Sequence, residues 1–261
     1  MFSLYLECKQ EEKDRLIAEL WDRGSSGITE SDVPAGTCAL RAFFDDGESG
    51  ALIREFAHWG ARSEPELPRD WIAEARAKLV PVHVGARFFL VPEWCDDPTP
   101  PGRFRIEVNP GMAFGTGAHE STQLCIEALE HELKSGMTVL DVGTGSGILS
   151  TAARFLGAGQ VIACDVDPVA IELAKQPLSF VGSVDAIRAH TIDLIVANIS
   201  PEAIISLAPD LTRVLRPPGL AIVSGFETPE VADVQAALES AGGKVRSSRT
   251  KGSWAALVAS I

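Results

Sequence analysis

The chain has 261 residues, of which 46% are hydrophobic, and 36 acidic against 23 basic side chains give it a formal net charge of -13. The apolar content is sufficient for one large or two modest domains, and the acidic balance disfavours nucleic acid as a directly bound partner, because phosphates are held by clustered Lys and Arg. No apolar run reaches the roughly 18 residues that a membrane span requires, and five scattered cysteines without a C-x-x-C pair favour reduced thiols in the cytoplasm over disulfides or a metal site.

The sequence of residues 1–67 predicts a small α+β domain. An alternating strand begins at Phe2, and helical spacing follows from Glu11 until Gly24 stops it. The remaining expected elements are strands at Gly27–Glu30 and Cys38–Phe44, a helix at Glu48–Trp59 and a last strand at Ala61–Leu67. The order β-α-β-β-α-β is typical of a ferredoxin-like domain.

The same segment is acidic. It contains 14 Asp or Glu and 7 Lys or Arg, so 7 - 14 gives a net charge of -7. A solvated surface that keeps the chain in solution is the simpler interpretation, and a docking face for a basic protein is the more specific one. Prolines bracket residues 69–80, which predict a linking helix, so we expect residues 1–67 to form one domain, 68–80 a linker and 81–261 a second domain.

After the linker, strands are predicted at Phe88–Val91 and Phe104–Val108, joined as a hairpin by a long proline-rich loop. From His119 onward helices and strands alternate, which indicates a Rossmann-like α/β fold with a parallel sheet covered on both faces. The expected strands are Thr138–Asp141, Gln160–Cys164, Leu178–Val181, Asp193–Asn198 and Leu220–Gly225. A helix at Pro229–Ala241 precedes two runs, Lys244–Thr250 and Ser253–Ala259, that predict an antiparallel hairpin at the sheet edge.

Two glycine-rich loops indicate a ligand site. The first, NPGMAFGTG, spans Asn109–Gly117, and the second follows an apolar strand as Asp141-Val142-Gly143-Thr144-Gly145-Ser146-Gly147. Glycine lets a backbone approach a ligand closely, and the second loop opens a helix at the tip of a strand, where such folds bind ligands. Asp165 ends the next strand, where a carboxylate can accept hydrogen bonds from both ribose hydroxyls of a nucleoside, while Asp167 is the better candidate for capping the following helix.

The motifs DVGTGSG, ACDVDP and VANIS, in that order, resemble class I S-adenosylmethionine-dependent methyltransferases. NPGMAFGTGAHESTQL is similar to the signature of one family among them, PrmA, which methylates the eleventh protein of the large ribosomal subunit. The sequences DW at 70–71, VPEW at 91–94, SGF at 224–226 and SWAAL at 253–257 also stand in the order of that family. The resemblance therefore covers essentially the whole chain.

The resemblance implies a set of site residues around bound S-adenosylmethionine. Thr122 and Gly143 would contact the cofactor, Asp165 would bind its ribose, and Asn198 would stand at the tip of the fourth strand. Asp141 and Gly145 would belong to the same cofactor site, and the loop of Phe114, Gly115, Thr116 and Gly117 would close over cofactor and target amine. Two alternatives remain at this stage: Asn198 as a cap of the helix begun by Ser200, and Phe114 as ordinary packing.

The implied activity is N-methylation of lysine side chains, of the amino-terminal amine, or of both, on a basic ribosomal protein. We expect Asn198 to orient the amine and Phe114 to shield the transfer, with no metal ion, and a monomer that contacts neither membrane nor nucleic acid directly. Methylation of another protein or small amine, a non-catalytic module that keeps the fold, and a nicotinamide oxidoreductase are the alternatives. His119 is expected to act as a polar residue at a helix start rather than as a proton carrier.

One stretch departs from the family. The segment between Asp165 and Asn198 is short for its content, because it must supply two crossovers and a strand, and a parallel crossover normally needs a dozen or more residues by itself. We therefore expect a short helix at Pro168–Lys175 and almost no helix in the second crossover, 182–191. This segment would form the part of the site that holds the adenine. We therefore expect its shortness to affect the affinity for the cofactor.

Overall fold

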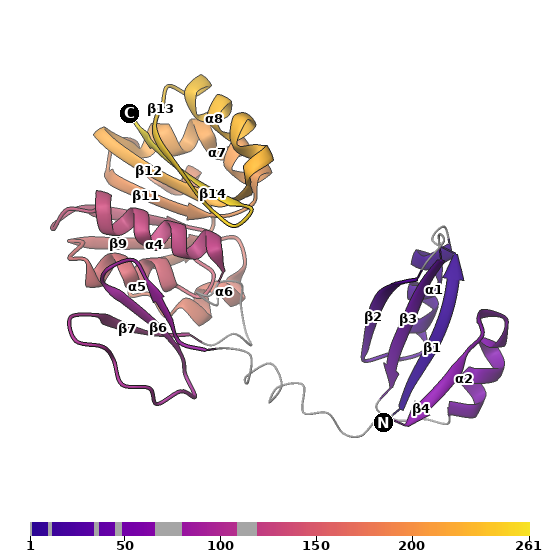
Figure 1. Ribbon diagram of the computed structural model, residues 1–261. Helices are drawn as coiled ribbons and strands as arrows, with labels where there is room; N and C mark the ends of the chain where they lie inside the picture. Colours follow the sequence, from indigo (N-terminus) through magenta and orange to yellow (C-terminus); the bar gives the residue numbers. More distant parts are fainter. Residues whose placement is uncertain (1, 10–11, 34–36, 45–48, 66–79, 109–118) are drawn as a thin grey trace. The chain divides into compact units, whose positions relative to one another are not determined.

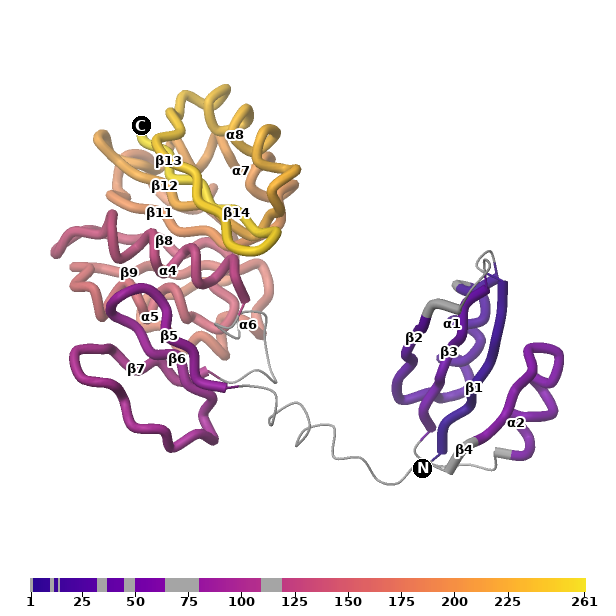
Figure 2. Tube along the Cα trace, in the orientation of Figure 1, coloured from indigo at the N-terminus to yellow at the C-terminus, as the bar shows by residue number. Residues whose placement is uncertain are grey.

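The computed structural model describes residues 2–9, 12–33, 37–44, 49–65, 80–108 and 119–261 (Figures 1 and 2). The chain divides into two compact units, Met1–Lys78 and Leu79–Ile261, which are taken separately below. Apart from Val80, the expected linker helix over 68–80 lies outside the described residues. The glycine loop Asn109–Gly117, with Phe114, Gly115, Thr116 and Gly117, also lies outside them.

The first unit is a four-stranded sheet with helices on one face. Its elements are β1 (Phe2–Lys9), α1 (Lys13–Asp22), β2 (Gly27–Val33), β3 (Thr37–Phe44), α2 (Ser49–Glu55), the 3₁₀ turn η2 (Ala57–Trp59) and β4 (Arg62–Pro65). The sheet order is β2-β3-β1-β4 and every described pairing is antiparallel. Alternate residues of β1, such as Leu4 and Leu6, pack against Leu16 and Leu20 of α1. This arrangement confirms the ferredoxin-like prediction.

A three-stranded sheet opens the second unit. It contains β5 (Val82–Val84), β6 (Phe88–Pro92) and β7 (Phe104–Val108) in that order, with β5 antiparallel to β6. The predicted hairpin of β6 and β7 is wrong, because these two strands are parallel. The loop between them returns the chain to the start of β6, where Arg103 Nη1 donates to the carbonyls of Gly85 (3.1 Å) and Phe88 (2.7 Å). An alternating pattern predicts a strand but not its direction.

The main sheet has seven strands in the order β10-β9-β8-β11-β12-β14-β13. The strands are β8 (Thr138–Val142), β9 (Gln160–Asp165), β10 (Ser179–Val181), β11 (Ile192–Asn198), β12 (Leu215–Glu227), β13 (Lys244–Lys251) and β14 (Trp254–Ser260). The first five named are parallel, and β14 runs antiparallel to both β12 and β13. The predicted Rossmann-like fold and the antiparallel edge hairpin are therefore confirmed.

Helices cover both faces of this sheet (Figure 1). They are α4 (Glu120–Glu132), α5 (Ile148–Phe155), α6 (Pro168–Ala174), α7 (Pro201–Val214) and α8 (Val231–Ser240), with 3₁₀ turns η3 (Val184–Ala186) and η4 (Thr228–Glu230). Leu194 and Val196 of β11 face the core formed with α4, α5 and the small sheet. Ile195 and Ala197 of the same strand face the core formed with α7 and α8. Burial on both faces explains why these strands are continuously apolar.

The compressed stretch is as short as the sequence predicts. Helix α6 ends at Ala174, and Lys175 leaves it in a left-handed conformation with φ 48°. Strand β10 has only three residues, and the crossover 182–191 that follows contains a single 3₁₀ turn, η3, in place of an α-helix.

Candidate functional site

A cavity of about 960 Å³ opens at the carboxyl ends of β8, β9, β11 and β12. Five residues that the sequence singles out line it together: Thr122, Gly143, Gly145, Asp165 and Asn198. Ligands of open α/β sheets bind at this edge, and the volume suits a molecule the size of a nucleoside cofactor. Asp141 is not among the lining residues.

The second glycine loop requires glycine at several positions. Gly143, Gly145 and Gly147 have φ values of 67°, 52° and 77°. A Cβ on Gly143 would collide with Cγ2 of Ile199, and one on Gly147 would lie 2.6 Å from Nε2 of Gln176 and 2.9 Å from the carbonyl oxygen of Ala174. The loop therefore combines left-handed backbone with close packing, against Ile199 at Gly143 and against Ala174 and Gln176 at Gly147.

Asp141 holds this loop from beneath. Its side chain is fully buried, and Oδ2 accepts hydrogen bonds from Thr144 Oγ1 (2.8 Å), Ser150 N (2.9 Å) and Ser150 Oγ (2.7 Å). Burial raises the pKa of the Asp141 carboxyl, while the hydrogen bonds from Ser150 and Thr144 oppose that rise. Its Oδ1 has no hydrogen-bond partner among the described residues. The position predicted to touch a cofactor thus supports the loop instead of lining the cavity.

Asp165 lies at the end of β9 with both carboxylate oxygens fixed. Oδ2 accepts from Gly145 N (3.0 Å) and Oδ1 accepts from Asp167 N (3.0 Å). Each oxygen keeps a further lone pair for a donor in the cavity. Asp167 is the N-cap of α6, accepting from Val169 N (2.8 Å), which confirms that the capping role belongs to Asp167 and leaves Asp165 for the cavity.

Asn198 ends β11 with its amide held in one orientation. Nδ2 donates to Oγ1 of Thr122 (3.1 Å), a side chain that is only 1% exposed. Oδ1 is buried and has no partner among the described residues. An unpaired buried acceptor costs about 1–3 kcal/mol, so such an atom in a residue that lines a cavity is a candidate acceptor for a ligand donor. The capping alternative for Asn198 is wrong, because Ser200 is the N-cap of α7.

Two aromatic rings form a further part of the wall. His119 is the N-cap of α4, where Nδ1 accepts from Ser121 N (3.4 Å), which confirms its expected role at a helix start. Its ring packs edge-on against Trp254, with centroids 4.3 Å apart, and both residues line the cavity. In the sequence, Trp254 stands out only as part of the SWAAL motif, and its position after a hairpin turn gives no signal that it faces a site.

Two other kinds of chemistry, metal catalysis and attack by a buried cysteine thiol, find little support among the described residues. Among them no group of three or more His, Cys, Asp or Glu is arranged to hold a metal ion. Burial raises the pKa of the Cys164 thiol to about 12 and raises that of Cys125 further, so neither buried thiol is a ready nucleophile. In the described part of the chain, every helix lacks the combination of length and apolar character that a membrane span needs.

Comparison with known proteins gives a consistent set of relatives. The sequence model of the family described as "Ribosomal protein L11 methyltransferase (PrmA)" matches residues 61–261. The chain is 39% identical over 204 residues to the ribosomal protein L11 methyltransferase of Pelobacter propionicus, and 41% identical over 201 residues to that of Anoxybacillus flavithermus. These matches cover 72% and 73% of this chain but 66% and 64% of the relatives, so the chain spans just under two thirds of their length.

A solved structure is similar over most of its own length. The ribosomal protein L11 methylase of Lactobacillus delbrueckii subsp. bulgaricus superposes with a TM-score of 0.65 at 31% sequence identity. The match covers 69% of this chain and 98% of that structure.

Proposed function

The chain belongs to the PrmA family of ribosomal protein L11 methyltransferases, and from this premise we propose that it transfers methyl groups from S-adenosylmethionine to amines of ribosomal protein L11. The target amines are lysine side chains, the amino-terminal amine, or both. The observation that carries the proposal is that Asn198, whose buried Oδ1 has no hydrogen-bond partner among the described residues, lines the same cavity as Gly143, Gly145 and Asp165.

The residues of the cavity fit the cofactor. Gly143 and Gly145 line the cavity with backbone, and Asp165 has lone pairs available for two ribose hydroxyls. Thr122 would contact the cofactor from the start of α4, and Asp141 would keep the loop in place from below. Bound S-adenosylmethionine would supply an electrophilic methyl group carried on a sulfonium.

On the acceptor side, Asn198 orients the amine. Its Nδ2 is committed to Thr122, so Oδ1 is the atom left to accept an N–H of the incoming amine. A lysine amine has an ordinary pKa of about 10.4 and must lose a proton before it can react. Desolvation in a largely apolar cavity favours the neutral form. Phe114, with Gly115, Thr116 and Gly117, would close the site and exclude water, which raises the effective molarity of the two reactants.

Residues 1–67 would recognise the substrate, with 68–80 as the linker and 81–261 as the methyltransferase domain. The net charge of this first part, 7 - 14 or -7, supports docking of a basic protein. Some of its carboxylates are already paired within the unit, including Glu30 with Lys13 (2.9 Å) and Glu19 with Arg15 (2.8 Å). These exposed pairs are weak and leave the overall charge acidic.

The proposal is tested by incubating the protein with methyl-labelled cofactor and purified L11, followed by mass spectrometry of intact protein and peptides. Methyl groups on L11 amines are expected, and Asn198→Ala should reduce the rate by about 100-fold or more, as removal of a positioning hydrogen bond in an active site does. Gln235→Ala changes an exposed amide on α8 and serves as the matched control.

Calorimetry separates the competing functions. Binding of S-adenosylmethionine without methylation of any protein would indicate a non-catalytic module, and labelling of a different protein would retain the chemistry and reject L11. Binding of NAD in place of S-adenosylmethionine would contradict the proposal altogether.

A further inference from the structure

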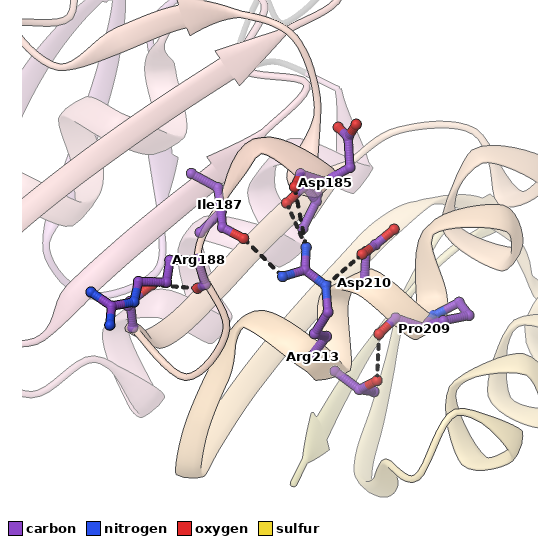
Figure 3. A network of polar contacts seen from close by, with 9 residues as sticks. Asp185, Ile187, Arg188, Pro209, Asp210 and Arg213 are labelled. Carbon is purple, nitrogen blue, oxygen red and sulfur yellow. Dashed lines mark hydrogen bonds and ion pairs between the residues drawn. The ribbon is translucent and has the colours of Figure 1, made fainter.

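Arg213, near the end of α7, binds the first half of the crossover 182–191 through its side chain. The guanidinium of Arg213 donates through Nη1 to the carbonyl of Ile187 (2.9 Å) and through Nη2 to that of Val184 (3.2 Å). Figure 3 shows these donors pointing into the bend of the crossover, with the carbonyl of Asp185 also within reach. In an α-helical crossover such carbonyls would accept bonds from within the helix. Here a single η3 turn is present: the carbonyl of Val184 accepts from Ile187 N (3.0 Å) within that turn, and Arg213 adds a donor to it and to the carbonyl of Ile187.

The guanidinium is itself held in position. Nε donates to Oδ1 of Asp210 (2.7 Å), one turn earlier on α7. The backbone next to Arg213 binds the end of the same crossover, because His190 N donates to the carbonyl of Arg213 (3.1 Å) and Thr191 N donates to that of Val214 (3.0 Å). A planar guanidinium fixed on one side presents its other donors in a fixed direction.

The fastened segment continues directly into the cavity wall. Val184 is fully buried in the core shared with α7, and Gly182 and Ser183 immediately before it line the cavity. Gly182 N also donates to the carbonyl of Asp165 (2.8 Å), so this part of the wall adjoins the residue assigned to the ribose. The position of residues 182 and 183 therefore depends on both β9 and Arg213.

We propose that Arg213 is a positioning residue for cofactor binding, which takes over the role of the absent crossover helix and keeps Gly182 and Ser183 in the wall that receives the nucleoside half of the cofactor. Arg213 is not among the residues that line the cavity, and it acts through the carbonyls of Val184 and Ile187. This inference rests on the proposed function, because the nucleoside is the ligand that Asp165 would hold.

The test measures binding of S-adenosylhomocysteine by calorimetry to the full chain and its variants. Arg213→Ala should raise the dissociation constant about tenfold. The dissociation constant of Arg213→Lys should fall between those of the parent chain and Arg213→Ala, because lysine keeps the positive charge but lacks the planar, forked donors of the guanidinium. Arg216→Ala is the matched control. Arg216 stands at the start of β12, directly after α7, and binds Asp193 Oδ1 (2.6 Å) and the carbonyl of Thr191 (3.0 Å), away from η3. Its removal should change affinity less than about twofold.

Two further readouts distinguish positioning from general destabilisation. Hydrogen exchange of the amides of residues 182–187 should accelerate in Arg213→Ala while exchange in β11 and β12 stays unchanged. At saturating cofactor, kcat and the KM for L11 should remain within about twofold of the parent chain.

Equal cofactor affinity in the parent chain and Arg213→Ala would overturn the inference, as would an equal loss in Arg216→Ala. If Arg213→Ala does not fold, the Arg213→Lys variant decides, and unchanged affinity there would reject the role. A parent chain that fails to bind S-adenosylhomocysteine would overturn the proposed function and this inference together, whereas binding with no effect at Arg213 would overturn only the latter.

Discussion

At the scale of single residues, the site depends on the hydrogen bonds of two polar side chains, Asn198 and Asp141. Asn198 lines the cavity, with its amide nitrogen bonded to Thr122 and its amide oxygen buried without a hydrogen-bond partner among the described residues. Asp141 fixes the glycine loop because three donors converge on one of its oxygens. The sequence identified both residues as part of a site. Only their contacts in the structure show that Asp141 supports the loop and that Asn198 lines the cavity.

Thr122→Val tests the orientation of Asn198. Valine keeps the shape of threonine but removes the oxygen that accepts from Nδ2, so the amide loses its fixed orientation and leaves a buried donor unpaired. We expect kcat/KM for L11 to fall about tenfold or more, while Thr122→Ser, which keeps the oxygen, stays within a few fold of the parent chain. Steady-state kinetics with labelled cofactor measures this, and equal activity of the valine and serine variants would contradict it.

Asp141 predicts a pH dependence of stability. Burial raises the pKa of this carboxyl above its ordinary 3.8, so the folded chain binds the proton more tightly than the unfolded chain. Protonation of Asp141 therefore stabilises the folded chain. This stabilisation is fully present at a pH below the pKa that Asp141 has in the unfolded chain, and it is lost as the pH rises through the pKa that Asp141 has in the folded chain. In urea unfolding between about pH 4 and pH 8, the parent chain should lose free energy of unfolding relative to Asp141→Asn. Curves that stay parallel across this range would contradict the assignment.

At the scale of elements, periodicity predicted which segments form strands and helices, but not how each is joined to its neighbours. Strands β6 and β7 were expected as a hairpin and are parallel, because Arg103 draws the start of β7 to the start of β6. The compressed crossover was expected from length alone. Its anchoring by Arg213 could not be expected, since nothing near Val184 in the sequence indicates a partner on α7.

The glycine loop should tolerate substitution less well than a glycine outside it. Gly136, in the turn before β8, and Gly147, in the loop, both have positive φ, 87° and 77°. A Cβ on Gly136 meets open space, whereas one on Gly147 meets Gln176 and the backbone of Ala174. Gly136→Ala should cost about 1–2 kcal/mol of unfolding free energy from the left-handed backbone alone. Gly147→Ala should cost about 3 kcal/mol or more, because the collision adds to the strain. Chemical denaturation compares the two, and equal losses would show that the packing behind the loop is unimportant.

At the scale of the whole molecule, the chain consists of two compact units with separate hydrophobic cores and uneven charge. The segment 1–67 contributes 7 - 14 or -7 of the total formal charge of -13. The unit proposed to recognise the substrate has its own core, and the cavity lies in the other unit. Electrostatic docking should therefore affect encounter with L11 more than the methyl transfer itself.

Salt dependence tests this separation. Raising the ionic strength from about 0.05 to 0.5 M shortens the range of charge attraction, so the KM for L11 should rise several fold while kcat changes little. The KM for S-adenosylmethionine, measured in the same series, serves as the internal control because its cavity lies in the other unit. A KM for L11 that is insensitive to salt would reject acidic docking and favour an apolar contact.

The sequence by itself determined the order and type of nearly all the elements, the two glycine loops and the family, because helix and strand periods, glycine positions and motif spacing are local properties of a chain. It also brought Thr122, Gly143, Gly145, Asp165 and Asn198 together correctly, since the ends of parallel strands meet at one sheet edge. Only the tertiary structure decided that Asp141 lies beneath the loop, that Trp254 joins the cavity wall, that β6 and β7 are parallel and that Arg213 replaces a helix. Each of these depends on contacts between residues far apart in the chain, and such contacts are set by the path of the backbone and by the burial that it creates.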